Sequence, residues 1–364
     1  MSFVTPRFSK NQVNRAGEIL SRPGAFTLQE EDWASEVLAN WRACHGYPIN
    51  TFQATLRAKL KNGYGDAIVA QRLKRAPSII LKLQRFAGMQ LARMQDIGGL
   101  RAVLSSLTRV RRLEKEYRTT TFEHELSNSK DYIAEPKDDG YRGVHLIYRY
   151  KNKRAPTYDG LSLELQIRTR RQHAWATAVE TMGTFLGQAL KAGQGDDQWR
   201  EFFAKAGAAI AILEGSPPVP GYEGCSRKAV FDDVATTEAR LRVLERLQGF
   251  AIAADQITTE RGQGAYHLIV LDSDRRLVTI RPYPVANLAQ ATNDYAIVEK
   301  RTKDGEPVEA VLVSAGPVTA LRKAYPNYFL DTQAFVAEMN AVISEVAARP
   351  ATKRLRRTVP RSRR

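Results

Sequence analysis

The chain has 364 residues, of which 43% are hydrophobic and 26% charged, and this balance excludes wholesale disorder. The length predicts two domains, one large and one small. The formal net charge is +16, and the fourteen residues 351–364 contribute +7 of it, so the rest of the chain carries +9. This excess of positive charge outside residues 351–364 indicates a polyanionic partner such as nucleic acid, nucleotide phosphates or an anionic membrane. An excess of solvated surface charge without such a partner explains it equally well.

The two cysteines, Cys44 and Cys225, are far apart in the sequence, which excludes a disulfide framework and a cysteine-rich zinc site. Their scarcity is typical of a reducing compartment. No apolar run approaches the roughly 18 residues of a membrane span, and the N-terminus lacks the apolar stretch of a signal peptide. We therefore expect a cytoplasmic protein without a membrane partner.

The first half of the chain alternates helical and strand patterns. Ser78 and Thr169 each precede a helical pattern and are the expected N-caps of those helices. We expect helices within 13–60, over 79–86 and from 170 onward, and strands over 68–75, 100–104, 144–150 and 161–168.

The second half contains a Pro- and Gly-rich loop at 214–221, a helical segment near 238–254, and then hairpin patterns. These patterns indicate a small α+β domain attached to a larger one, with a basic, disordered tail from 350. We expect hairpins pairing 266–271 with 277–283 and 296–300 with 308–314, followed by helices over 318–324 and 332–346.

Phosphate-binding side chains gather early in the chain, where neither a P-loop nor a dinucleotide fingerprint occurs. Arg72 and Lys74 are two residues apart on a strand and share one face. Ser78 and Lys82 are four residues apart on the following helix and also share a face. This group of four fits a phosphate site, and a solvated basic edge is the alternative.

The strand over 161–168 alternates strictly, with leucine and isoleucine on one face and Ser162, Glu164, Gln166 and Arg168 on the other. The polar face is either the floor of a site or a solvated surface. Magnesium is usually held by one or two carboxylates together with substrate phosphates. Asp96 and Glu164 would supply such a pair if their strands are neighbours.

A loop before the strand at 144 presents an aromatic ring and a guanidinium group. Pro136 and Gly140 favour a turn that places Tyr141 and Arg142 at its mouth. These side chains suit base stacking and phosphate contact, and ordinary loop packing is an equal alternative for Tyr141.

Three segments together resemble the RelA/SpoT nucleotidyl pyrophosphokinase domain over roughly residues 69–180: DIGGLR from Asp96, PKDDGYRGVH from Pro136, and ELQIRT from Glu164 with QHAWA from Gln172. That family transfers the β,γ-pyrophosphate of ATP to a ribose 3′-hydroxyl with Mg²⁺, on a mixed β-sheet flanked by helices. The resemblance implies an adenine site between Arg72 and Arg101, ATP phosphates on Lys74, Ser78 and Lys82, catalytic Mg²⁺ ligands at Asp96 and Glu164, and acceptor contacts from Tyr141, Arg142, His145, Gln166 and His173.

Two departures lie on the acceptor side. The loop has Tyr-Arg-Gly-Val-His where alarmone synthetases usually have Tyr-Arg-Ser-Leu-His, and Ala-Thr-Ala-Val-Glu-Thr follows Trp175 in place of Ala-Glu-x-Glu-His. No His-Asp hydrolase motif precedes the domain. Residues 325–328, Tyr-Pro-Asn-Tyr, form either a packed turn or an element similar to that of the fused toxin–antitoxin proteins that sense phage capsid (CapRel).

The CapRel resemblance implies an autoinhibited toxin that pyrophosphorylates the 3′ CCA end of tRNA, blocks translation and is activated by a phage protein. Tyr325 and Tyr328 would plug the adenine site. The implied division is a toxin domain at 1–258, an antitoxin domain resembling a degenerate zinc finger at 259–349, and a tail at 350–364. The alternatives are a (p)ppGpp or (pp)pApp synthetase with a regulatory domain, and a non-catalytic RNA-binding protein of the same fold.

Overall fold

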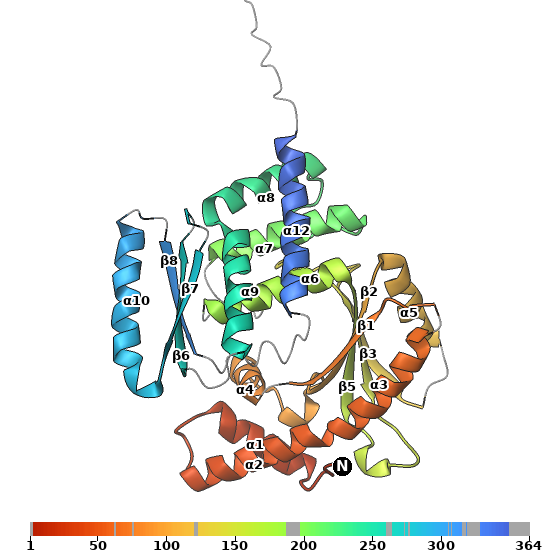
Figure 1. Cartoon of the computed structure of the whole chain (residues 1–364). Helices are drawn as coiled ribbons and strands as arrows, with labels where there is room; N and C mark the ends of the chain where they lie inside the picture. Colours follow the sequence, from red (N-terminus) through yellow and green to blue (C-terminus); the bar gives the residue numbers. More distant parts are fainter. Residues whose placement is uncertain are drawn as a thin grey trace, which may run out of the picture.

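The computed structural model describes residues 3–61, 63–74, 76–119, 123–186, 197–259, 264–272, 274–275, 277–304, 306, 308–314, 318 and 328–348. It contains a five-stranded sheet, a three-stranded sheet and a group of helices between them (Figure 1). The expected α+β class with a mixed sheet is confirmed. Tyr325, the tail from 350 and all but the first residue of the helix expected over 318–324 lie outside the described residues.

The five-stranded sheet has the order β1-β2-β5-β4-β3, and it is mixed because β2 and β5 run parallel while the other pairs are antiparallel. Four of its strands were expected from the sequence within one or two residues at each end. The edge strand β3 was not, because its residues are polar and lack an alternating pattern. The strands are β1 (Ile68–Leu73), β2 (Gly98–Leu104), β3 (Glu125–Asp131), β4 (Val144–Arg149) and β5 (Ser162–Thr169).

Helices cover the apolar face of this sheet. Leu163, Leu165 and Ile167 of β5 are fully buried in a core that also contains Phe52 and Leu113 from the two helices nearest the sheet. The opposite face of β5 is left for its polar side chains. The helical elements of this half are α1 (Lys10–Ser21), α2 (Leu28–Cys44), α3 (Gly46–Lys61), α4 (Ala76–Arg85), α5 (Leu107–Thr119), and the short η1 (Leu91–Arg93) and η2 (Pro156–Tyr158).

The expected N-cap at Ser78 is wrong. Helix α4 begins at Ala76, so Ser78 lies inside its first turn. Pro77 does not end the preceding strand but sits at the start of the helix, where its fixed φ is favourable and its missing N–H has no intrahelical partner to lose. The phosphate-binding candidates Ser78 and Lys82 therefore lie on one helix, as expected.

The second group of helices comprises α6 (Arg170–Phe185), α7 (Asp197–Glu214), α8 (Arg227–Leu241), α9 (Val243–Thr259) and α12 (Tyr328–Ala347). Thr169 caps α6 through a reciprocal pair of hydrogen bonds with Gln172, which confirms its predicted role. The single helix expected over 238–254 is two helices, because Arg242 adopts a left-handed conformation with φ of 51° between α8 and α9.

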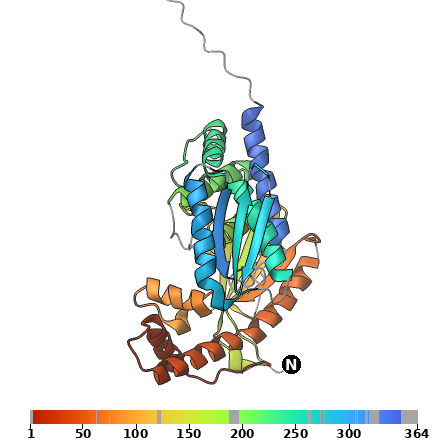
Figure 2. The same ribbon diagram turned by 60° about the vertical axis from the view of Figure 1, so that its left-hand side comes forward.

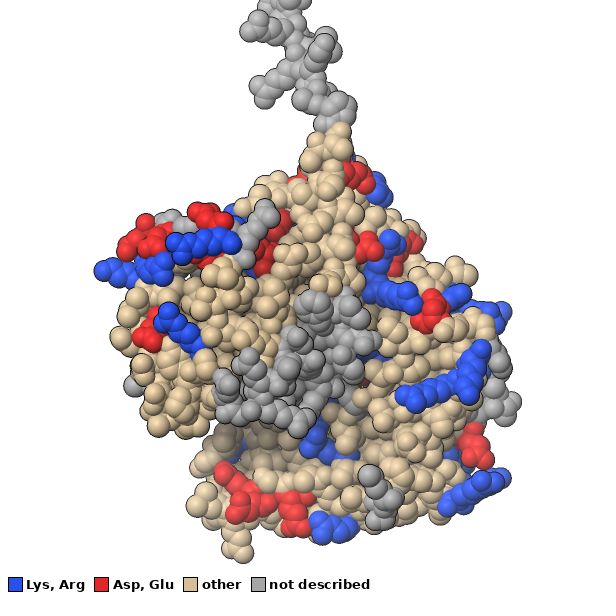
Figure 3. Space-filling model, viewed as in Figure 1, with Lys and Arg blue, Asp and Glu red and all other residues tan. Residues whose placement is uncertain are grey.

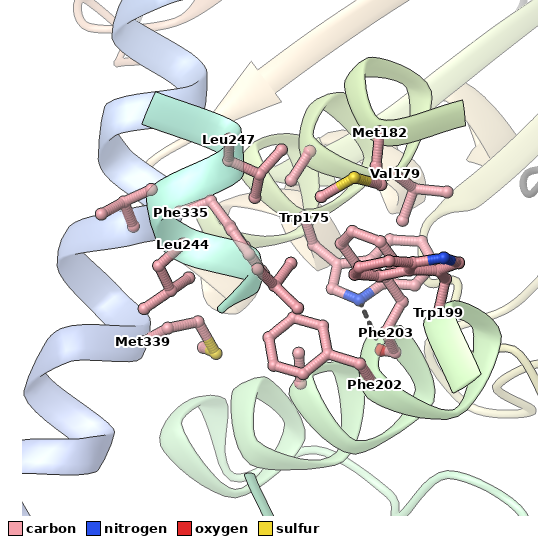
Figure 4. Close-up of a cluster of buried hydrophobic side chains, with 14 of the residues drawn as sticks. Trp175, Val179, Met182, Trp199, Phe202, Phe203, Leu244, Leu247, Phe335 and Met339 are labelled. Carbon is pink, nitrogen blue, oxygen red and sulfur yellow. Dashed lines mark hydrogen bonds between the residues drawn. The ribbon is translucent and has the colours of Figure 1, made fainter. Parts of the chain in front are cut away.

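A second hydrophobic core joins these helices (Figure 4). Trp175 of α6 donates its indole N–H to the carbonyl of Phe203 on α7 at 2.8 Å. Phe335 and Met339 of α12 are fully buried in the same cluster. Helix α12 thus shares a core with residues before 258, although it belongs to the expected C-terminal domain; the domain division itself stays a prediction.

The three-stranded sheet has the order β7-β6-β8, formed by β6 (Tyr266–Asp272), β7 (Leu277–Tyr283) and β8 (Val308–Ser314). The hairpin of β6 with β7 is as expected. The second hairpin is wrong: residues 296–300 lie inside α10 (Leu288–Lys303), which follows η4 (Val285–Asn287), and β8 pairs with β6 instead. Helix α10 lies on the outer face of this sheet (Figures 1 and 2).

No metal-ligating group of three or more His, Cys, Asp or Glu residues occurs among the residues described, and the zinc-finger resemblance of this part stays a prediction. None of the described helices has both the length and the apolar character that a membrane span requires.

Two glycines let α7 approach the loop that carries Tyr141. A Cβ added to Gly207 would lie 2.7 Å from the Cα of Gly140 and 2.9 Å from its carbonyl oxygen. Gly140 itself has φ of 91°, a conformation that favours glycine. The contact between the two backbones therefore fixes the loop against the helix.

Gly207→Ala should separate α7 from this loop, because both obstructing atoms are backbone. Although alanine is the better helix former, we expect a loss of about 1–3 kcal/mol of stability from overpacking. Urea unfolding measures it. Gly65→Ala is the control, since a Cβ at Gly65 meets nothing within 4 Å. Equal stability of the two variants would contradict the close contact.

Candidate functional site

The parallel pairing of β2 with β5 brings the predicted site residues together. Gly99 lies opposite Glu164, and Arg101 lies opposite Gln166. On the other side of β2, Arg72 of β1 pairs with Gly99; the backbone of Arg72 is described but its side chain is not. Asp96 stands just before β2. The condition set by the sequence, that the strands of the two acids are neighbours, is met.

The two acids share one pocket. It is lined by Asp96, Arg101, Glu164 and Gln166 together with four further residues of β1 and β2, namely Ala70, Gln71, Gly99 and Leu100. The polar face of β5 is therefore the floor of a pocket rather than an open solvated surface. Arg101 approaches Gln166 with guanidinium–amide distances of 3.4 and 3.5 Å, which are long for hydrogen bonds.

Two lysines hold Asp96. The Lys74 Nζ donates to one carboxylate oxygen at 2.7 Å and the Lys82 Nζ to the other at 3.0 Å. Burial alone would raise the pKa of Asp96, but the positive charges of Lys74 and Lys82 outweigh it and the net pKa is lowered. Asp96 is thus an ionised carboxylate. Both predicted phosphate-binding lysines contact it, Lys74 from just after β1 and Lys82 from α4.

Glu164 is held by donors on both oxygens. His145 Nδ1 lies 2.8 Å from Oε1, and the Gln166 side-chain amide donates to Oε2 at 2.8 Å. His145 Nε2 in turn lies 2.6 Å from the Tyr141 hydroxyl. Three of the predicted acceptor-site residues are therefore connected to the predicted metal ligand.

Tyr141 is packed in this structure. Its side chain is part of the second hydrophobic core, and its ring contacts Tyr132 edge-on and lies 6.2 Å from Trp175. The Lys137 ammonium lies 5.3 Å from the ring centroid. The loop-packing alternative describes this arrangement, and stacking on an acceptor base stays a prediction.

Arg142 and His173 do not line the pocket. The Arg142 guanidinium, 2% exposed, donates to the carbonyls of Gly207 at 2.7 Å and Pro217 at 3.1 Å. Burial lowers the pKa of Arg142 to about 10, so the group stays charged at neutral pH. Both terminal nitrogens of Arg142 bind backbone carbonyls in this structure, and its acceptor contact stays a prediction.

His173 faces Arg168 and the C-terminal helix. Burial, reinforced by the charge of Arg168, lowers the pKa of His173 to about 3, so the imidazole is neutral at physiological pH. Arg168 donates to Nδ1, which leaves the proton on Nε2, 3.0 Å from a carboxylate oxygen of Asp331. Sequence reasoning missed Asp331, because no local pattern signals a contact so distant along the chain.

Two carboxylates fit the requirements of Mg²⁺, which uses one or two protein carboxylates and completes its coordination with water and phosphates. Asp96 and Glu164 line the same pocket and influence one another, since the charge of Glu164 opposes the lowering of the pKa of Asp96. The donor set suits a metal brought in with a nucleotide.

Residues 71–183 match the family model described as "Region found in RelA / SpoT proteins". This part of the chain is therefore similar to the RelA/SpoT family. The range contains every predicted ATP- and acceptor-site residue and ends within α6. The resemblance deduced from the motifs is confirmed at this level, while the specific relationship to CapRel proteins is not established.

Two curated relatives are GTP pyrophosphokinases of Bacillus subtilis (strain 168). YjbM is 32% identical over 116 residues, which are 31% of this chain and 54% of YjbM, and YwaC is 27% identical over 157 residues, 40% of this chain and 72% of YwaC. The chain thus spans about half the length of the first relative.

Solved structures of two related proteins are similar to about half of this chain. Small alarmone synthetase 1 from Bacillus subtilis, bound to its product pppGpp, is 20% identical, with a TM-score of 0.42 over 50% of this chain and 94% of its own. A GTP pyrophosphokinase family protein from Streptococcus pneumoniae is 21% identical, with a TM-score of 0.39 over 52% of this chain and 93% of its own.

Asp96→Asn should destabilise the protein by about 1–3 kcal/mol at pH 7, because two largely buried ammonium groups lose their carboxylate. The folded pKa of Asp96 is lower than its unfolded value, so its stabilisation is complete above that unfolded value and is lost as the pH falls through the folded pKa. Urea unfolding at pH 7, 5 and 3.5 should show a gap between wild type and variant that narrows only at the lowest pH.

The control for this series is Glu36→Gln, which breaks the exposed pair with Arg7 and should change stability little at any pH. A gap for Asp96→Asn that is absent at pH 7, or that widens on acidification, would show that the two lysines do not depend on this carboxylate.

Proposed function

We propose that this chain is an ATP-dependent pyrophosphokinase that transfers the β,γ-pyrophosphate of ATP to a ribose 3′-hydroxyl. The observation that carries the proposal is the convergence of Asp96 and Glu164 on one pocket, with Lys74 and Lys82 beside it, inside a RelA/SpoT domain. A binding module would not need paired acids among basic groups, which argues against the non-catalytic alternative.

The reaction requires mainly positioning and neutralisation of charge. The acceptor 3′-oxygen forms a bond to the β-phosphorus, the bond from that phosphorus to the α,β-bridging oxygen breaks, and AMP leaves. Lys74 and Lys82 bind the phosphate oxygens, and Glu164 receives the proton of the attacking hydroxyl. Mg²⁺, held by Asp96 and Glu164, supplies charge neutralisation at the phosphates when bound.

The acceptor that we propose is the 3′ CCA end of tRNA, with inhibition of translation as the result. The +9 charge of the chain before 351 and the altered acceptor-side sequence support a polyanion larger than a nucleotide. Basic side chains are interspersed with acidic ones on the face shown in Figure 3 and do not merge into one patch among the described residues drawn there. The similarity to GTP pyrophosphokinases favours the second candidate, a (p)ppGpp or (pp)pApp synthetase.

Glu164→Gln should reduce pyrophosphate transfer a hundredfold or more, because it removes the proton acceptor and a metal carboxylate. The assay incubates purified protein with γ-labelled ATP and, separately, GTP, ATP or deacylated tRNA, and asks which acceptor carries label. Glu125→Gln, at the exposed start of β3, is the matched control. A folded Glu164→Gln protein with more than about a tenth of wild-type turnover would contradict the assignment.

The same assay separates the two acceptors. Label on tRNA, with binding that weakens as salt rises, supports the tRNA proposal. Efficient labelling of GTP or ATP, with no label on tRNA, would contradict the tRNA proposal and support alarmone synthesis. A protein ending at residue 350 is tested in parallel, because the seven basic residues of the tail alone would produce a salt dependence.

We further propose that the C-terminal part restrains the enzyme in cis until a phage capsid or other phage protein binds. This follows the resemblance to CapRel, and the contact of Asp331 on α12 with His173 supports a physical connection to the RelA/SpoT domain. Tyr325 and Tyr328 are the residues assigned to the adenine site, where each ring would gain about 0.5–2 kcal/mol from cation–π contacts.

Tyr325→Ala combined with Tyr328→Ala should raise basal ATP use and cellular toxicity while Glu164 is intact. A restraint of a few kcal/mol leaves a small active population, which removal of both rings would enlarge. ATP hydrolysis and transfer are measured beside thermal melting, with Glu164→Gln added as the inactive control. Unchanged activity in a folded variant would place the restraint elsewhere.

A further inference from the structure

Lys74 is anchored through its backbone as well as through its ammonium group. It follows β1 directly, and its backbone amide donates to the carbonyl of Ile97 at 2.8 Å. Its own carbonyl accepts a hydrogen bond of 2.8 Å from the Nε of Arg42, which lies in the last turn of α2. An N-terminal helix therefore holds the backbone of a residue that the proposed reaction assigns to the ATP phosphates.

The packing of the end of α2 fixes the place of Arg42. Trp41 and Cys44, its neighbours on this helix, are buried in the core that also contains the apolar face of β5. His45, the C-cap of α2, is 1% exposed, and a Cβ added to Gly98 at the start of β2 would lie 3.2 Å from the Cβ of His45. Arg42 thus comes one turn before a corner that is pressed against the sheet.

The surroundings of Arg42 are not those of an ordinary ion pair. Its side chain is partly buried, and burial lowers the pKa of the guanidinium, with no opposing carboxylate close to it among the residues that the structure describes. A partly buried charge without an acidic partner is unfavourable for stability. Stability alone therefore does not explain an arginine at this position, whereas a strong donor to the Lys74 carbonyl does.

The backbone anchor becomes more important at the stage when ATP is bound. In this structure Asp96 holds the Lys74 ammonium group at 2.7 Å. The proposed reaction gives Asp96 to Mg²⁺ and the ammonium group to phosphate, so Lys74 loses that side-chain contact. The reach of its ammonium group is then set by the position of its backbone, which Arg42 and Ile97 hold from opposite sides of the residue.

We infer that Arg42 is a positioning residue that holds the backbone of Lys74 so that the ammonium group meets the phosphates of ATP. The inference rests on the proposed function. Arg42 lies outside residues 71–183, so the match to the family model assigns it no role. Because a misplacement of about 1 Å can slow a reaction about a hundredfold, a looser Lys74 backbone should slow transfer although Arg42 acts only through Lys74.

Arg42→Met tests this role, because methionine fills the arginine side chain as far as Nε and cannot donate. We expect kcat/KM for ATP to fall about 10- to 100-fold, with the KM for the acceptor changed less than about twofold. Arg42→Lys keeps a donor near the carbonyl and should retain more activity than Arg42→Met. Arg57→Met, at an exposed position of α3, is the matched control and should keep wild-type kinetics.

A purely structural role of Arg42 predicts a different result. The melting temperature of Arg42→Met would then fall, while kcat/KM for ATP, calculated for the folded protein, would stay at the wild-type value. Thermal melting beside the kinetic assay distinguishes the two cases, and wild-type kcat/KM in folded Arg42→Met protein would contradict the inference.

A double variant tests whether Arg42 acts through Lys74. Once Lys74→Met has removed the ammonium group, its backbone anchor has no charge left to place, so adding Arg42→Met should weaken ATP binding no further. Calorimetry with Mg²⁺ and the α,β-methylene analogue of ATP measures this binding without turnover. If Arg42→Met weakens binding in the Lys74→Met protein as much as in the wild type, Arg42 acts on something other than Lys74 and the inference is wrong.

Hydrogen exchange in the protein without nucleotide separates this inference from the proposed function. The Lys74 amide should exchange about tenfold faster in Arg42→Met than in the wild type or Arg57→Met, while the amides of β4 keep their wild-type rates. Label on none of the acceptors with the wild type, together with the expected exchange, would overturn the proposed function and leave the backbone anchor intact. An unchanged exchange rate of the Lys74 amide would overturn the inference, whatever the activity.

Discussion

The parallel pairing of β2 with β5 is the constraint on which the candidate site depends. Its register places Gly99 beside Glu164 and Arg101 beside Gln166, and it brings Asp96, just ahead of β2, to the same pocket. A shift of one residue would turn Glu164 toward the core and a leucine toward the pocket. The buried leucine face of β5 resists that shift, so the apolar core that stabilises the sheet also aligns the acids.

The charges around Asp96 set a condition on the proposed reaction. Lys74 and Lys82 both bind this carboxylate, yet the proposal gives those ammonium groups to the ATP phosphates and the carboxylate to Mg²⁺. Two ammonium groups and a metal ion would compete for the same two oxygens, so the proposed reaction requires Lys74 and Lys82 to exchange Asp96 for phosphate if Asp96 is to hold Mg²⁺. Phosphate oxygens for that exchange arrive only with the nucleotide, which favours joint entry of ATP and Mg²⁺.

Local patterns predicted what depends on local physics. The sequence alone predicted the alternation of β5 and the cap at Thr169, because hydrophobic periodicity and helix capping are properties of short segments. For the same reason it showed the motifs around Asp96, Tyr141 and Glu164. Residues 296–300 were mistaken for a strand because β-branched residues such as Ile297 and Val298 also occur in helices that pack on a sheet. The burial of Arg142 under α7 depends on the contact of Gly140 with Gly207, which joins distant segments and leaves no local signal.

Helix α12 limits how the C-terminal part could exert the proposed restraint. Three acids seven residues apart on one stripe, Asp331, Glu338 and Glu345, bind His173, Arg171 and Arg227, while apolar residues including Phe335 and Met339 enter the second core. Exposing one such side chain costs about 1.5–3 kcal/mol. The free energy needed to release the whole helix is therefore larger than the few kcal/mol by which the proposed restraint favours the inactive state. The proposed activation would therefore either leave α12 in place or require a partner whose preference for the released state is at least that large.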